Sequence, residues 1–184
     1  MRVISGSARG RKLLEPRGMD VRPTTDKVKE SIFNIIQFDI PGRTVLDLFA
    51  GTGQLGLEAL SRGAASAVFV DESTEAKRLV EGNLKRTGMR AEKLIRSTAS
   101  AYLETAGKFD IIFLDPPYDS GILDKIIKKI QLFDILNENG IIVCESRLDR
   151  PMPETDAPYV KLREYCYGKV KITIYTKQGE GENT

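Results

Sequence analysis

The sequence predicts an α/β fold in which helices cover both faces of a mostly parallel sheet. Short apolar runs alternate with amphipathic helical segments between residues 44 and 145, and such βαβ alternation produces parallel strands. The pattern then changes, because two strand-like segments, Tyr159–Cys166 and Lys169–Lys177, flank Tyr167-Gly168. This arrangement predicts a closing antiparallel hairpin, so we expect about seven strands in total.

Hydrophobic periodicity and terminating glycines predict the individual elements. Residues 2–5 and 11–14 are expected to form short strands around a loop at 6–10, and a helix containing Val28, Ile32, Ile35 and Ile36 begins near Thr24 or Thr25. The strands expected next are Thr44–Phe49, Ala67–Asp71, Lys93–Arg96, Phe109–Leu114 and Ile141–Glu145. The helices expected between them are Gln54–Arg62, Thr74–Arg86, Ser100–Thr105 and Ile122–Leu136.

Positive charge is concentrated at the N-terminal end of the 184-residue chain. The net charge is +2, yet six basic side chains face two acidic ones in residues 1–22. A local basic patch can attract a polyanion although the whole chain is nearly neutral; an ordinary solvated hairpin is the alternative. We expect a basic hairpin extension at 1–22, a single domain at 23–177 and a flexible polar tail at 178–184.

Composition excludes several classes of site. The chain has no histidine, which rules out a histidine-dependent triad and a histidine-ligated metal. Cys144 and Cys166 are too few for a zinc site or a disulfide framework, and both are expected to be buried thiols. We expect no metal. No apolar stretch has transmembrane length and the N-terminus lacks a signal-peptide pattern, so we expect no membrane association and a cytoplasmic location.

A glycine-rich loop, Asp47–Gly53, joins a predicted strand to a predicted helix. Gly51, Gly53 and Gly56 fit the pattern G-x-G-x-x-G, and Asp71 follows Gly51 by 20 residues at the end of the next strand. This combination fits a dinucleotide such as NAD. It fits S-adenosylmethionine equally well, because both ligands contain an adenosine whose ribose hydroxyls need an acceptor. A simple tight turn is the third alternative.

Asp47 favours S-adenosylmethionine over NAD. Its carboxylate lies four residues before Gly51, where it would repel the negatively charged pyrophosphate of a dinucleotide. S-adenosylmethionine has no phosphate and carries an ammonium and a sulfonium. Asp47 can therefore accept a hydrogen bond from the amine of the methionine part.

The tetrapeptide Asp115-Pro116-Pro117-Tyr118 follows the predicted strand Phe109–Leu114. Ligands bind at this end of the strands in open α/β sheets. Asp115 and the Pro116 carbonyl can hold the two hydrogens of an exocyclic amine and stabilise the charge that develops on nitrogen during methyl transfer, and Tyr118 can stack on the extruded base. A proline-stiffened turn is the structural alternative. The chemistry fits adenine and guanine alike.

Three segments together resemble one family of enzymes. They are Arg22–Glu30, Asp47–Ala64 and Asp115–Tyr118, and Val3–Gly6 and Arg9–Leu13 also match. This combination is similar to the RsmD-type methyltransferases, bacterial enzymes that methylate guanine N2 in 16S ribosomal RNA of the small subunit. The resemblance covers nearly the whole chain. It implies a Rossmann-like S-adenosylmethionine-dependent methyltransferase fold, with Asp115, Pro116, Pro117 and Tyr118 as the catalytic group.

The resemblance also implies binding roles for other residues. Asp47, Phe49, Gly51 and Gly53 would contact the methionine part of the cofactor, Asp71 would bind the ribose beside Glu72, and Arg22–Thr25 would close over cofactor and base. Such enzymes usually place an acidic residue near the adenine, where this chain has Thr98 and Ala99. The implied cofactor set is Thr24, Asp47, Phe49, Ala50, Gly51, Thr52, Gly53, Asp71, Glu72, Thr98 and Ala99; the RNA contacts are Arg9, Arg11, Lys12 and Arg22.

Two other functions remain open on the residues alone. Asp-Pro-Pro-Tyr also suits an adenine-N6 methyltransferase of DNA or RNA, although no separate target-recognition domain is evident. The glycine loop also suits an NAD-dependent oxidoreductase or a nucleotide-binding module. On the methyltransferase interpretation, the partner is ribosomal RNA within an assembling small subunit, and the protein is a monomer.

Overall fold

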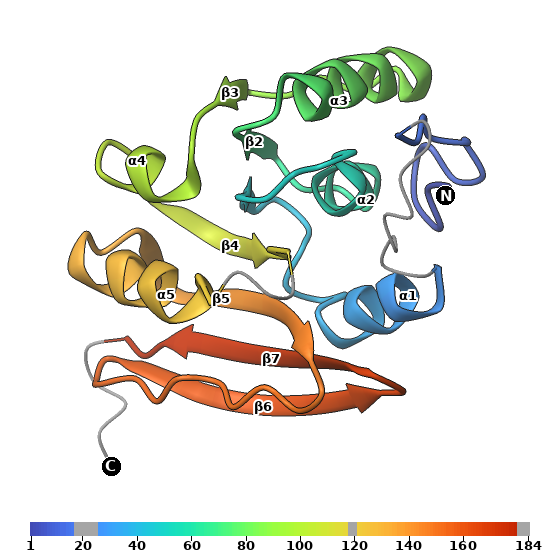
Figure 1. The fold of residues 1–184 in the computed structure, drawn as a ribbon. Coiled ribbons are helices and arrows are strands. Elements are labelled where there is room, and N and C mark those ends of the chain that lie inside the picture. The colour runs from blue at the N-terminus through green and yellow to red at the C-terminus, as the bar shows by residue number, and fades with distance from the viewer. Residues whose placement is uncertain (17–25, 118–120, 180–184) are drawn as a thin grey trace.

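A computed structural model describes residues 1–16, 26–117 and 121–179, and it contains one seven-stranded mixed sheet in the order β3-β2-β1-β4-β5-β7-β6. Strands β1, β2, β3, β4 and β5 are parallel, and β7 is antiparallel to β5 and β6. The predicted parallel sheet and C-terminal hairpin are therefore confirmed (Figure 1). The strands are β1 (Thr44–Asp47), β2 (Ser66–Asp71), β3 (Lys93–Arg96), β4 (Phe109–Leu114), β5 (Leu136–Arg147), β6 (Tyr159–Tyr167) and β7 (Val170–Lys177).

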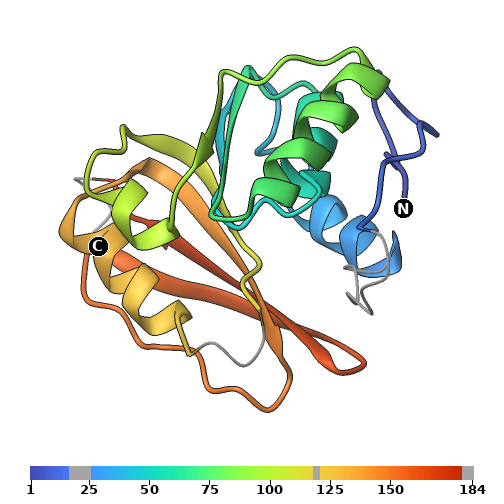
Figure 2. The ribbon, with the colours of Figure 1, turned by 45° about the horizontal axis from the view of Figure 1, so that its top comes forward.

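Five helices in the described residues cover the two faces of the sheet. Helices α1, α2 and α3 pack on one face around Phe33, Leu57 and Val80, while α4 and α5 pack on the other around Leu103 and Ile127 (Figures 1 and 2). Both faces are thus buried, which explains the nearly continuous apolar runs of the parallel strands. The helices are α1 (Asp26–Ile35), α2 (Gln54–Ser61), α3 (Thr74–Thr87), α4 (Ala99–Leu103) and α5 (Leu123–Leu132).

Strand β5 differs most from the prediction. The helix expected to reach Leu136 ends at Leu132, and Leu136 instead begins a strand that continues to Arg147. Asp134 and Asn139 adopt positive φ angles of 50° and 57°, a conformation that aspartate and asparagine tolerate better than most residues. The Asn139-Gly140 pair therefore does not follow a helix but lies inside the strand, where the pairing with β4 shifts register between Phe109 and Ile111.

The N-terminal hairpin is a compact loop rather than two strands. The predicted strands at 2–5 and 11–14 are reduced to one antiparallel bridge between Arg2 and Lys12, with backbone bonds joining Val3 to Gly10 and Arg11. The hairpin packs closely on α2, since a Cβ atom at Gly6 would lie 1.7 Å from the Ser61 carbonyl oxygen. The strand prediction was wrong because this segment is held by contacts with α2 and not by a ladder of its own.

Two further expectations concern composition. Cys144 is buried as expected, but Cys166 is exposed, because its side chain on β6 at the sheet edge points away from the core. Among the described residues, no helix combines the length and apolar character that crossing a membrane requires, and no group of three or more acidic or cysteine side chains forms a metal site.

Candidate active site

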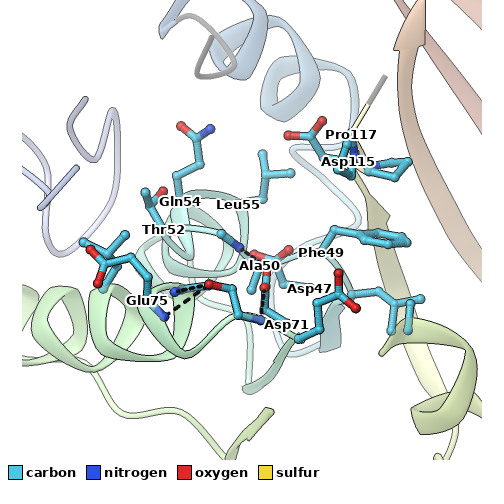
Figure 3. Close-up of a pocket in the computed structure, with 18 of the residues that line it drawn as sticks. Asp47, Phe49, Ala50, Thr52, Gln54, Leu55, Asp71, Glu75, Asp115 and Pro117 are labelled. Atoms are coloured by element: carbon cyan, nitrogen blue, oxygen red, sulfur yellow. Dashed lines mark hydrogen bonds between the residues drawn. The ribbon is translucent and has the colours of Figure 1, made fainter. Parts of the chain in front are cut away.

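A pocket of about 1030 Å³ opens at the carboxyl ends of the parallel strands (Figure 3). It is lined by the loop after β1, the loop after β2 and the loop after β4, which brings together Asp47, Asp71 and Asp115. In the view of Figure 3, Phe49 lies between Asp115 and Asp71. Twelve predicted site residues line this pocket: Asp47, Phe49, Ala50, Gly51, Thr52, Asp71, Glu72, Thr98, Ala99, Asp115, Pro116 and Pro117.

The remaining predicted site residues fall into three groups. Among the described residues, Gly53 does not line the pocket. It is the N-cap residue of α2, with a left-handed φ of 77°. Arg9, Arg11 and Lys12 are exposed on the N-terminal hairpin, outside the pocket. The predictions for Tyr118, Thr24 and Arg22 lie outside the described residues.

Asp47 is a carboxylate with an unusual environment. It ends β1, is only 2% exposed, and its Oδ2 accepts a hydrogen bond from the Gly56 N–H at 2.9 Å. Burial raises the pKa of Asp47 to about 7; the Gly56 bond acts in the opposite direction, and the nearby Asp71 adds to the rise. A cation in the pocket would favour the charged form of this carboxylate, which fits a ligand that carries an ammonium group.

Asp71 holds the glycine loop in place. Its Oδ2 accepts from the Gly51 N–H at 2.9 Å, and its Oδ1 accepts from the Ser73 N–H at 2.9 Å. An ionised carboxylate offers about four acceptor positions, so both oxygens keep capacity for ribose hydroxyls. The structure thus gives Asp71 a loop-positioning role that the sequence did not predict, and its predicted ribose contact stays a prediction.

The loop after β3 forms the pocket wall beyond Asp71. Thr98 caps α4, and its Oγ1 accepts from the Ala101 N–H at 3.2 Å. Ser97 and Ser100 line the same wall. The Thr98 oxygen accepts one bond from the helix, so its hydroxyl hydrogen and its second lone pair remain for a ligand. A predicted contact with adenine at Thr98 and Ala99 remains a prediction.

Gln54 was missed by the sequence reasoning. It begins α2, lines the pocket and is 7% exposed, and its Oε1 has no hydrogen-bond partner among the described residues. A buried amide oxygen without a donor is costly, so a donor on a bound ligand would stabilise it. The position directly after Gly53 was the available signal, because the first turn of such a helix faces the ligand.

Two other pocket residues come from elements distant in sequence. Lys125 reaches the wall from the first turn of α5, and Glu145 reaches it from β5 with an exposure of only 3%. The prediction that a strand ends at Glu145 could have identified this residue, because parallel strands end at the same edge of a sheet. What the sequence did not show is which strand lies beside β4.

The N-terminal segment also reaches this pocket. Met1 and Glu15 line it, and the Thr52 hydroxyl lies 3.2 Å from the Met1 sulfur. Asn83 on α3 connects this segment to the glycine loop, because its amide nitrogen donates to the Thr52 carbonyl at 2.9 Å while its Oδ1 accepts from the Leu14 N–H at 2.6 Å. The basic hairpin and the glycine loop are therefore joined through one buried side chain.

Comparison with known proteins adds an independent finding. The family model described as "Conserved hypothetical protein 95" matches residues 1–176. The chain is 44% identical to "Putative rRNA methyltransferase YlbH" of Bacillus subtilis, over 97% of this chain and 100% of that protein. It is 34% identical to "Ribosomal RNA small subunit methyltransferase D" of Escherichia coli, over 100% and 93% of the two chains. The solved structure "Putative methyltransferase yhhF from Escherichia coli" superposes with a TM-score of 0.87 at 34% identity, over 98% and 99% of the two chains.

Proposed function

The chain belongs to the family of Conserved hypothetical protein 95, together with ribosomal RNA small subunit methyltransferase D, and on this premise we propose that it methylates the N2 amino group of a guanine in 16S ribosomal RNA. The cofactor is S-adenosylmethionine. The observation that carries the proposal is the position of Asp115, Pro116 and Pro117 on the wall of a pocket that also contains Asp47 and the glycine loop. Such a pocket can hold a methyl donor and a base side by side.

The cofactor end of the pocket fits the donor. Asp47 supplies a buried carboxylate for an ammonium group, and the Gln54 Oε1 needs a hydrogen-bond donor. Asp71 and Glu72 are available for ribose hydroxyls, and Thr98 and Ala99 border the adenine side. When bound, S-adenosylmethionine supplies a methyl group that is already activated by its sulfonium. The described residues therefore need to bind and orient, and the reaction requires no metal.

The base end orients the acceptor. Asp115 and the Pro116 carbonyl accept the two N2 hydrogens, which directs the nitrogen lone pair towards the methyl group. The same acceptors stabilise positive charge as it develops on nitrogen. The roles proposed for Tyr118 and Arg22–Thr25 rest on the family resemblance alone, since these residues lie outside the described part of the chain. Alignment contributes a large part of the rate because a bimolecular step becomes effectively unimolecular.

The test of this function is the variant Asp115→Ala, with Asp39→Ala as the matched control on an exposed residue away from the pocket. Methyl incorporation into unmodified 16S ribosomal RNA is expected to fall about 100-fold or more in Asp115→Ala. The affinity for S-adenosylhomocysteine, measured by calorimetry, is expected to stay within about threefold, because the cofactor residues are intact. Unchanged turnover in Asp115→Ala would overturn the assignment.

Product analysis separates the two other functions. Digesting the methylated RNA to nucleosides is expected to give N2-methylguanosine, whereas N6-methyladenosine, or incorporation into duplex DNA instead of RNA, would identify an adenine enzyme. Calorimetry is expected to show binding of S-adenosylhomocysteine and no binding of NAD. Tight binding of NAD alone would establish a dehydrogenase or nucleotide-binding module.

The N-terminal hairpin is proposed to bind RNA phosphates. Arg9, Arg11 and Lys12 are exposed there, and the hairpin is fixed next to the pocket by α2. In the double variant Arg9→Ala/Arg11→Ala, RNA affinity is expected to fall and the slope of log K against log salt to decrease by about two. The control Arg163→Ala/Lys169→Ala alters exposed basic residues of the C-terminal hairpin, and it is expected to leave the slope unchanged. Equal slopes in both variants would contradict this role.

The natural substrate is proposed to be a partly assembled small subunit, acted on by a monomer in the cytoplasm. A small basic hairpin contacts few phosphates, so ribosomal proteins would complete the docking surface. Methylation of protein-bound particles is therefore expected to be faster than methylation of naked RNA, and equal rates would count against this substrate.

A further inference from the structure

Glu145 is a buried carboxylate next to the catalytic tetrapeptide. It lies near the carboxyl end of β5, is 3% exposed, and lines the same pocket as Asp115 and Pro116. Strand β5 is parallel to β4, with Leu114 paired to Cys144. The next residue on β5 is Glu145, and the next residue after the end of β4 is Asp115, so both acids follow this last pair and line the same pocket.

The alternation of side chains gives the side of the sheet that Glu145 faces, and the pocket lining brings Asp115 to the same cavity. Along a strand, successive residues face opposite sides. Val143 and Phe113 belong to the core beneath α1, α2 and α3, whereas Cys144 and Leu114 belong to the core beneath α4 and α5. Glu145 follows Val143 by two residues within β5 and therefore faces the side of α1, α2 and α3, and Asp115, directly after β4, lines the same pocket. The pocket wall at this point is therefore built from two carboxylates.

Carboxylates distinguish the two candidate bases by hydrogen-bond chemistry. An ionised carboxylate only accepts hydrogen bonds. The Watson–Crick edge of guanine presents two adjacent donors, the N1–H and the N2 amino group. Adenine presents an amino group beside an N1 that is itself an acceptor, so a second carboxylate would meet a lone pair. A wall of two acceptors matches guanine and penalises adenine, and such a mismatch is an effective way to reject a competing substrate.

We propose that Glu145 determines base specificity by accepting the N1–H of the target guanine while Asp115 and the Pro116 carbonyl accept the N2 hydrogens. This proposal rests on the function proposed above and names the residue that selects guanine at that site. Asp-Pro-Pro-Tyr alone fits both bases, so the second carboxylate supplies the selectivity that the tetrapeptide lacks. Glu145 is expected to position the base and does not touch the methyl donor.

The test replaces the carboxylate by an amide of the same shape. Glu145→Gln keeps one acceptor and adds an N–H donor, which can pair with an N1 acceptor. The matched control is Glu138→Gln, at an exposed position of the same strand. Substrates are 16S ribosomal RNA carrying either guanine or 2-aminopurine at the methylated position, since 2-aminopurine keeps the N2 amine but has an acceptor at N1.

For the wild-type protein, kcat/KM with guanine is expected to exceed that with 2-aminopurine about tenfold or more. In Glu145→Gln the guanine rate is expected to fall about tenfold and the preference for guanine to shrink by a similar factor. The affinity for S-adenosylhomocysteine should stay within about threefold, because the cofactor side is unchanged. Glu138→Gln should match the wild type in every measurement.

Two outcomes would overturn the inference. Equal wild-type rates on guanine and 2-aminopurine would do so without any variant, so the test does not depend on Glu145→Gln folding. An unchanged guanine preference in Glu145→Gln would exclude the specificity role, and if both rates fell equally, Glu145 would be merely structural. If the wild type forms no N2-methylguanosine at all, the proposed function itself fails, which is a separate result.

Discussion

Two hairpins, one at each end of the chain, are attached to the central α/β region in different ways. The C-terminal hairpin, β6 and β7, continues the sheet through a ladder of main-chain pairs along β5 from Ile141↔Thr176 to Arg147↔Val170. The N-terminal hairpin, residues 1–14, has only the Arg2–Lys12 bridge of its own. Two buried polar side chains attach it, Glu58 on α2 and Asn83 on α3. We name this pair and its contacts the N-terminal junction.

Glu58 is the centre of the N-terminal junction. It is completely buried on α2, and its carboxylate accepts from the Ile4 N–H at 2.7 Å and the Ser5 N–H at 2.9 Å. It also accepts from Arg62 at 2.9 Å and lies 3.6 Å from the buried Lys29 ammonium. Burial lowers the pKa of Lys29, and the neighbouring Glu58 opposes this change. One side chain thus joins the hairpin, α1 and α2.

These two kinds of attachment predict different sensitivities of stability to single substitutions. A β-ladder distributes its hydrogen bonds over backbone groups that side-chain substitutions other than proline leave in place, whereas the N-terminal junction depends on a few side chains. The junction is also next to the glycine loop, since Asn83 contacts both Leu14 and Thr52. Substitutions there should affect stability and cofactor binding together, while matched substitutions on the C-terminal side should affect neither strongly.

The largest effect is expected for Glu58→Gln. Removing the charge leaves the Lys29 ammonium buried without its partner, which costs about 3–5 kcal/mol of unfolding free energy. Urea unfolding followed by circular dichroism measures this loss. The matched control is Glu164→Gln on β6, where the carboxylate contacts Thr173 and Lys171 at 3.3 and 3.8 Å. That pair is partly exposed, so the control should lose less than about 1 kcal/mol. Similar losses in both variants would show that the two attachments do not differ.

A smaller effect is expected for Asn83→Ala. The variant leaves the Leu14 N–H and the Thr52 carbonyl without their bonds, which costs about 2 kcal/mol. Because Thr52 belongs to the glycine loop, the affinity for S-adenosylhomocysteine should fall as well. Asn137→Ala is the control, since Asn137 donates to Asp110 at 2.9 Å and neither residue lines the pocket. Calorimetry should show an unchanged affinity for S-adenosylhomocysteine in Asn137→Ala. An unchanged affinity in Asn83→Ala as well would contradict the predicted coupling between the N-terminal junction and the glycine loop.

The smallest effect concerns the pH dependence of the ligand-free protein. Burial raises the pKa of Asp47 from 3.8 to about 7, so the folded state binds more protons than the unfolded state between these values. Stability therefore falls as pH rises through this window, by about 1 kcal/mol between pH 6 and pH 7. Urea unfolding at the two pH values measures this change in the free energy of unfolding.

Asp47→Asn is the control for this pH effect, because it removes the titrating carboxyl, and its stability should be nearly flat over the same interval. With S-adenosylhomocysteine bound, the ammonium favours the ionised carboxylate, so binding at pH 6 should release a proton. Calorimetry in buffers of different ionisation enthalpy detects that release. Identical pH profiles for the wild type and Asp47→Asn would contradict the environment described for Asp47.

Much of the fold could be predicted because its signals are local. Apolar runs fixed β1, β2 and β4, and the glycine at position 88 ended α3 close to the expected residue. The end of α5 and the start of β5 were misjudged, since the chain leaves α5 through Asp134 with a positive φ and Asn139, also with a positive φ, lies within β5. The prediction of two N-terminal strands was wrong for a related reason, because the hydrogen-bond partners of this segment lie on α2, far away in sequence.

The chemical groups of the site, and the strand ends that carry them, could be read from the local residue pattern alone. Asp47, Asp71 and Asp115 each follow a recognisable strand, and parallel strands bring such ends to one edge. Which of these side chains lie in one pocket depends on the tertiary structure. It brought Glu145 into the same pocket as Asp115 because β5 pairs with β4, and it used Asp71 and Asn83 to hold the glycine loop. These contacts depend on strand order and helix packing, which no local pattern of residues encodes.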